Sequence, residues 1–140
     1  MWFKNYTKEE ANNITRNTIL EHLDIQIEEI ADDYIKGSMP VDHRTHQPYG
    51  LLHGGASVTL AESLGSLGAS FIIDLNEFYP VGIEINANHI RSVRSGRVTG
   101  IAKPIHTGRS THVWEIKICD EKDRLVCVSR LTLSIIEKKF

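Results

Sequence analysis

The sequence predicts an α+β fold in which a curved antiparallel sheet wraps around one long central helix. Residues 54–73 (GGASVTLAESLGSLGASFII) are apolar almost all round, so they predict a buried helix. Four segments that alternate apolar and polar residues follow this run, and short turns join them, which favours antiparallel pairing. Because a helix that is apolar on several sides can be covered only by a sheet that curls around it, the two patterns together indicate this architecture.

The composition indicates one globular domain over residues 1–140. The chain has 41% hydrophobic residues, 24% charged residues and a net charge of −2, which gives no electrostatic basis for binding nucleic acid. The two cysteines, Cys119 and Cys127, are too few for a disulfide framework and fit a reducing compartment. The N-terminus lacks the apolar core of a signal peptide, so we expect a cytoplasmic protein.

The first elements are a short helix and a hairpin. Residues 7–23 predict an amphipathic helix that Thr7 caps, with Glu10 in the capping-box position. The alternating isoleucines of residues 25–30 predict a strand, and residues 34–40 predict its hairpin partner. A polar loop, residues 41–53, then leads to the long helix.

The four alternating segments after the linker 74–80 predict a meander of consecutive strands. They are residues 81–91, 96–106, 111–119 and 124–136. In residues 81–91, the alternation predicts that one face of the strand carries Val81, Ile83, Ile85 and Ala87. The other face would carry Gly82, Glu84, Asn86 and Asn88. A helix about 30 Å long carries more apolar surface than six strands hide, so we expect an oligomer with sheets joined edge to edge.

Glu62 is the only charged residue of the long helix. Burying an unpaired carboxylate is costly, so a carboxylate kept in such a place is a candidate general base or nucleophile. The alternative is a structural carboxylate paired with a neighbour such as Arg91 or with a backbone amide. A central Glu is also expensive in lipid, so we expect no membrane partner.

The sequence His53-Gly54-Gly55 stands directly at the start of the helix. Glycines let a substrate approach the backbone closely, and the free N–H groups of a first helical turn form an anion site. The alternative is an ordinary helix start, with His53 as a capping or core residue. We expect no metal site, because His43 and His46 have no Cys or carboxylate at diagnostic spacing.

Three motifs in a specific order resemble the hotdog-fold acyl-CoA thioesterases: QPYGLLHGGASVTLAES, VGIEINANHIRSVRSGRV and KPIHTGRSTHVWEIKICDE. The closer likeness is to the phenylacetate-type branch, which contains the enterobactin-proofreading and dihydroxynaphthoyl-CoA thioesterases. The resemblance spans about residues 24–136. It implies a hotdog fold, hydrolysis of aromatic or aryl-like acyl-CoA substrates, no cofactor because CoA is part of the substrate, and a homotetramer built as a dimer of dimers.

The resemblance also implies roles for individual residues. Glu62 would act as general base on water or as nucleophile, and the Gly54 N–H would hold the oxyanion. Gln47 would hold the lytic water or the carbonyl, and His53 would orient the thioester or support the leaving thiolate. Ser66, one turn beyond Glu62, would hydrogen-bond it or line the acyl pocket, and Ser63 is similar; for both, a small packing residue is the alternative.

The resemblance implies that two further segments, residues 89–92 and residues 106–111, bind the nucleotide and pantetheine end of CoA. Arginine side chains suit the recognition of its phosphates. The substrate-binding residues so implied, with Gly82, are His89, Ile90, Arg91, Ser92, His106, Thr107, Gly108, Arg109, Ser110 and Thr111. The alternative for each segment is a solvated turn.

Two other classes share the fold: a non-catalytic acyl-CoA-binding module, and a hydratase or dehydratase. A pure binder would not require Glu62 together with Gln47 and His53. The order of HGG and Glu on one helix fits a thioesterase better than a hydratase.

Overall fold

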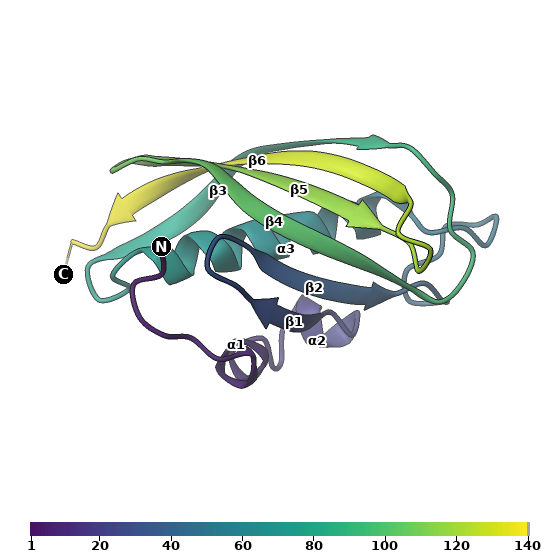
Figure 1. Ribbon diagram of the computed structural model, residues 1–140, viewed down its shortest axis with the longest axis horizontal. Helices are drawn as coiled ribbons and strands as arrows, with labels where there is room; N and C mark the ends of the chain where they lie inside the picture. Colours follow the sequence, from purple (N-terminus) through teal and green to yellow (C-terminus); the bar gives the residue numbers. More distant parts are fainter. Residues whose placement is uncertain (140) are drawn as a thin grey trace.

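A curved sheet covers one side of a long central helix, and a short helical segment lies below (Figure 1). The computed structural model describes residues 1–139, and Phe140 lies outside the described residues. The central helix is α3 (Gly54–Ile72), and the sheet has six strands. The predicted α+β architecture, with a curved antiparallel sheet around one central helix, is therefore confirmed.

The sheet order is β1-β2-β4-β5-β6-β3, so the predicted meander is wrong for one strand. The strands are β1 (Gln26–Ile30), β2 (Ile35–Pro40), β3 (Phe78–His89), β4 (Arg97–Thr107), β5 (Thr111–Cys119) and β6 (Leu125–Glu137). β3 pairs with β6 instead of β4, because β2 occupies the remaining edge of β4. Helix α3 connects β2 to β3 below the sheet and so delivers the chain to the far edge. Alternation predicts a strand but not its partner.

A β-bulge in β3 changes the face on which its first residues lie. The register shifts between Gly82 and Glu84, so that Gly82 pairs with the buried Leu133 and faces α3. Val81 and Ile83 are 43% and 63% exposed. The predicted placement of these two residues with Ile85 on one face is wrong, because the bulge inserts an extra residue into the strand.

The predicted N-terminal helix is divided into α1 (Lys8–Ile14) and α2 (Ile19–His22). The capping box is confirmed, since Thr7 and Glu10 exchange side chain-to-backbone hydrogen bonds of 3.1 Å in both directions. The helix breaks at Asn17, whose φ is 61°. Thr18 then caps α2 by accepting the Leu20 N–H at 3.2 Å.

Close contact between α3 and the sheet depends on glycines. A Cβ added to Gly68 would lie 2.5 Å from the Trp114 ring, and one added to Gly65 would lie 2.6 Å from Leu131. The sheet-facing side of α3 is buried as predicted, whereas the opposite side, which carries Glu62, is only half-buried. No helix within residues 1–139 has the length and hydropathy that crossing a membrane requires.

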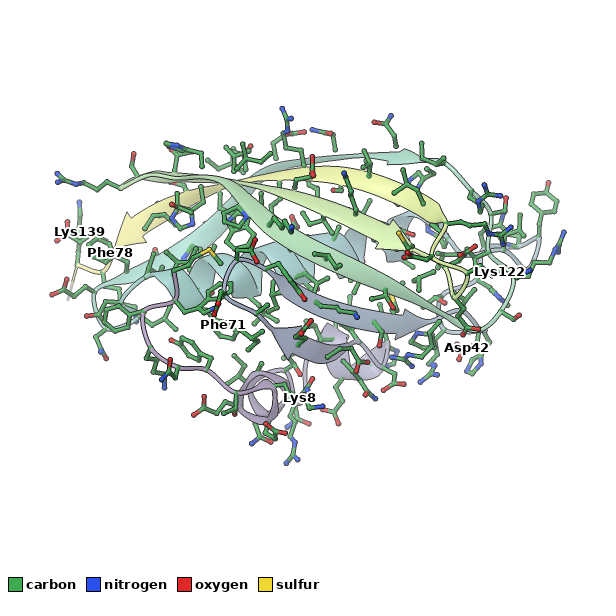
Figure 2. The ribbon with its side chains drawn as sticks, viewed as in Figure 1. Lys8, Asp42, Phe71, Phe78, Lys122 and Lys139 are labelled. Carbon is green, nitrogen blue, oxygen red and sulfur yellow. The ribbon has the colours of Figure 1, made fainter. Side chains whose placement is uncertain are left out.

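The chain start is tied to the end of α3 around Phe71, which lies between the sheet and the N-terminal segment (Figure 2). The Tyr6 ring stacks on the Phe71 ring with centroids 4.1 Å apart, and the Phe3 N–H donates to the Phe71 carbonyl at 2.7 Å. These contacts fix the N-terminal segment against the C-terminal end of α3.

Candidate active site

His53 caps helix α3 with its ring. Its Nδ1 accepts the Gly55 N–H at 2.7 Å, which places the ring proton on Nε2 and leaves Nε2–H as an outward donor. A Cβ on residue 55 would lie 2.9 Å from this ring, so the cap requires glycine there. The capping alternative for His53 is thus correct, and the cap itself prepares a hydrogen-bond donor.

The Gly54 N–H is the amide of the first helical turn that keeps no hydrogen-bond partner within residues 1–139. The Gly55 N–H is taken by the His53 ring, and the next two N–H groups donate to the His53 carbonyl at 3.0 and 3.2 Å. A Cβ on residue 54 would lie 2.8 Å from His89 Nε2, so His89 packs against this glycine. A free donor at the positive end of a helix dipole suits a developing oxyanion.

A groove of about 310 Å³ opens at this end of α3. This α3 N-terminal groove is lined by Gln47, Leu51, Leu52, Gly54, Ser57, His89, Ile90, Arg91, Ser92 and Val126. The Gln47 side-chain carbonyl accepts the N–H groups of Tyr49 and Leu51, which turns its NH2 group outward as a donor. The groove therefore joins two predicted catalytic residues to the first predicted CoA-binding segment.

Glu62 lies in a second, separate groove of about 300 Å³. This Glu62 groove is lined by Ile14, Thr15, Thr18, Leu20, Glu62, Ser63, Ser66, Leu67 and Ser70. The half-buried Glu62 carboxylate makes no hydrogen bond or ion pair in the described part of the chain. Pairing with Arg91 is therefore wrong within one chain, since Arg91 lies in the other groove, and Ser66 does not bond Glu62 either.

Gly82 of β3 lies against the Glu62 carboxylate. A Cβ on residue 82 would be 3.3 Å from Glu62 Oε2. The bulge is what turns this residue inward, and alternation alone places it on the opposite face of the sheet. Gly82 thus gives the carboxylate room beside the backbone.

The two grooves do not share a reaction centre within one chain. Gly54 and Glu62 are separated by eight positions of α3, about 12 Å along the helix axis. A thioester carbonyl must lie about 3 Å from an oxyanion donor, with the attacking water held equally close to the base. One chain therefore supplies both groups but does not direct them at one carbonyl.

The second predicted CoA-binding segment lies at the opposite end of α3. Thr107, Gly108 and Arg109 line a pocket of about 280 Å³, the hairpin pocket, together with Ile72, Ile73, Asp74, Phe78, His112 and Ile135. His106 and Ser110 are exposed in the same β4–β5 hairpin, and Thr111 is half-buried. The hairpin and the start of α3 are at opposite ends of the molecule (Figure 1), so one chain does not bring the two segments together.

His112, next to this hairpin, is a buried group that titrates abnormally. The residue is 2% exposed, and its Nδ1 has no hydrogen-bond partner in the described residues. Burial lowers the pKa of His112, and the charge of His106 lowers it further. Between the lowered folded pKa and the ordinary value of 6.5, the unfolded chain binds more protons than the folded protein.

We therefore expect His112 to leave the free energy of unfolding unchanged above about pH 6.5 and to lower it as the pH falls below that value. His112→Leu should flatten this decrease, by at most about 1.4 kcal/mol per pH unit. Thermal unfolding between pH 7.5 and pH 5 measures this pH dependence, with His43→Gln as the control at a surface-exposed histidine. An equally steep loss in His112→Leu would show that other groups carry the pH dependence.

Six residues of the Glu62 groove escaped the sequence-based prediction of the site: Leu67 and Ser70 of α3, and four residues of the N-terminal segment, Ile14, Thr15, Thr18 and Leu20. The expected continuous helix over 7–23 places the latter four on a surface element remote from the chemistry. The signal that reveals the break is a second capping pattern, Thr18 followed three residues later by Glu21, whose carboxylate accepts the Asn17 N–H.

Residues 49–127 match the Thioesterase superfamily. The chain is 52% identical over 136 residues to the 1,4-dihydroxy-2-naphthoyl-CoA hydrolase of Escherichia coli (strain K12), which covers 97% of this chain and 99% of that protein. It is 45% identical over 136 residues to the proofreading thioesterase EntH of Cronobacter turicensis, and the alignment covers 97% of this chain and 98% of that protein.

Solved structures agree with this relationship. A mutant of the thioesterase PA1618 from Pseudomonas aeruginosa superposes with a TM-score of 0.96 at 47% identity, over 98% of this chain and 99% of that chain. The thioesterase HI1161 from Haemophilus influenzae superposes with a TM-score of 0.94 at 51% identity, over 97% of this chain and 94% of that chain. The chain therefore belongs to the thioesterase superfamily and is a thioester hydrolase with the hotdog fold.

Proposed function

We propose that this protein hydrolyses acyl-CoA thioesters to a free acid and CoA, with a preference for aromatic or aryl-like acyl groups. The observation that carries the proposal is a pair of unused groups on α3: the Gly54 N–H, which has no partner, and the Glu62 carboxylate, which has none either within residues 1–139. Thioester hydrolysis needs this combination of an oxyanion donor and a base.

In the proposed reaction, the thioester carbonyl oxygen accepts the Gly54 N–H. In the first route, Glu62 removes a proton from water as the water oxygen bonds to the carbonyl carbon; the carbon–sulfur bond then breaks, and the thiolate takes up that proton. In the second route, the carboxylate attacks the carbonyl carbon, the carbon–sulfur bond breaks as the anhydride forms and the thiolate leaves, and water then cleaves the anhydride. The outward Nε2–H of His53 and the NH2 group of Gln47 hold the leaving sulfur and the carbonyl or water in place.

We also propose that the site is completed by a second copy of the chain. β3 is a free edge of 12 residues with the apolar Val81 and Ile83 exposed, and a long free edge favours pairing with another strand. Two-fold pairing of β3 with β3 would run the two α3 helices antiparallel. It would bring Gly54 of one copy toward Glu62 of the other, within a cytoplasmic tetramer built from two such dimers.

The same pairing would join the two separated CoA-binding segments. The hairpin pocket of one copy, with Arg109, would approach the α3 N-terminal groove of the other, with His89 and Arg91. The guanidinium groups of Arg91 and Arg109 have no hydrogen-bond or ion-pair partner in the described chain, so both are free to bind phosphate.

The substrate preference is supported by the size and chemistry of the Glu62 groove. About 300 Å³ is at the small end for ligand pockets, and Ser63 and Ser66 keep free hydroxyls inside it. A compact ring with polar substituents would fill such a groove. The E. coli relative is named for 1,4-dihydroxy-2-naphthoyl-CoA, which makes this thioester the first substrate to test.

The test is thiol release from 1,4-dihydroxy-2-naphthoyl-CoA, benzoyl-CoA and palmitoyl-CoA, followed with a thiol-reactive dye. We expect fast release from the two aromatic thioesters and slow release from palmitoyl-CoA. Tight binding of all three without release would contradict the proposal and indicate a non-catalytic acyl-CoA-binding module.

A further inference from the structure

The wall of the Glu62 groove that faces α3 comes from the break between α1 and α2. Ile14 and Leu20 line this wall, whereas Ser63, Ser66 and Leu67 line the side formed by α3. Ile14 is 59% exposed, which is unusual for an isoleucine that lines a groove beside a candidate base. A large apolar side chain exposed at this place is suited to contact a ligand rather than the core.

The wall is held in place by hydrogen bonds, so it is a fixed boundary. The Asn12 side chain brackets one residue of β1: its NH2 donates to the Ile27 carbonyl at 3.0 Å, and its oxygen accepts the Ile27 N–H at 2.8 Å. The Thr15 hydroxyl donates to the Asn12 carbonyl at 2.9 Å. The Thr18 hydroxyl in turn donates to the Thr15 carbonyl. The side chain at position 14 therefore determines how far the groove extends on this side.

The chemistry of the wall is that of an apolar end. Because the hydroxyls of Thr15 and Thr18 are already committed to backbone carbonyls, the wall offers Ile14 and Leu20 to a ligand mainly as carbon surface. Leu20 also packs against the hydrophobic core, whereas Ile14 is not part of it. Position 14 is thus the place where the groove can be reshaped without disturbing the fold.

We propose that Ile14 is a specificity-determining residue that limits the length of the acyl group beyond the thioester carbonyl. This inference rests on the proposed acyl-CoA hydrolysis at Glu62. The Ile14 side chain lies on the wall that faces α3, so a compact aromatic acyl group would fit beside it and a long chain would meet it. Shortening the side chain should admit longer acyl groups, and enlarging it should exclude them.

The test compares kcat/KM for decanoyl-CoA and benzoyl-CoA in the full-length protein. Ile14→Ala should raise the decanoyl-to-benzoyl ratio about tenfold, and Ile14→Phe should lower it by a similar factor, the range expected for a few carbons in an apolar pocket. The matched control is Ile19→Ala, because Ile19 is 57% exposed in the same segment but does not line the groove. Thermal unfolding checks that all three variants fold.

The outcomes separate this inference from the function on which it rests. An unchanged ratio in both Ile14 variants, in a wild-type protein that hydrolyses benzoyl-CoA, would overturn the role of Ile14 alone. An equal shift in Ile19→Ala would overturn it too, since the effect would then not come from the groove. No release of CoA by the wild-type protein from either substrate would overturn the proposed function and the inference together.

Discussion

Glu62→Gln should lower kcat for a good acyl-CoA substrate by about 10²–10⁴-fold, the usual loss when a general base is removed. Gln keeps the volume of the side chain, so the groove and the packing against Gly82 are retained and only the basic or nucleophilic oxygen is lost. KM should change little, because Glu62 acts on water or the carbonyl carbon rather than on CoA. Steady-state thiol release measures both constants.

Two further variants provide a second test of the Glu62 carboxylate and a control. Glu62→Asp should be nearly as harmful, because withdrawing the carboxylate by one methylene spoils the geometry of attack. Glu115→Gln is the control, since Glu115 pairs with Lys117 at 3.7 Å on the outer face of the sheet, and it should leave kcat unchanged. Near-native turnover in either Glu62 variant would remove this residue from the mechanism.

Gly54→Pro should lower kcat about 10²–10³-fold more than Gly54→Ala does. Both substitutions add a Cβ that must displace His89, but only proline removes the N–H proposed to hold the oxyanion. Proline is tolerated at the first position of a helix. His53 before it is extended, with φ −70° and ψ 132°, as a residue preceding proline must be. The difference between the two variants therefore isolates one hydrogen bond.

Equal kcat values for Gly54→Pro and Gly54→Ala would show that this amide holds no charge in the transition state. Circular dichroism and thermal unfolding provide the check that α3 still forms in both proteins.

Much of the fold could be predicted because local patterns specify it. Alternation located all six strands to within a few residues, and the capping box marked the start of α1. Other features depend on long-range geometry. The pairing of β3 with β6 follows from the path of α3, and the inward turn of Gly82 follows from a single bulge that period-2 counting cannot register.

The candidate site likewise has some features that local sequence patterns predict and others that depend on long-range geometry. The motif around His53 has a local basis only in part: Gly55 leaves room for the His53 ring that caps α3, whereas Gly54 leaves room for His89, which comes from the distant strand β3. The separation of Gly54, Glu62 and Arg109 into three grooves could not be predicted, because sequence order does not state which groups face one another. The Ile14 wall could not be predicted either, since it exists only through the helix break at Asn17.

The most direct test of a shared site is complementation between two inactive variants. Glu62→Gln and Gly54→Pro chains, carrying different tags, are co-expressed, and the mixed assembly is purified. If each site takes Gly54 from one copy and Glu62 from the other, every mixed dimer has one of its two sites intact, so the purified mixed dimer should show about half of wild-type kcat and an unselected pool formed by random pairing about a quarter. No recovery in the mixed assembly, with wild-type protein active, would contradict a site built from two copies.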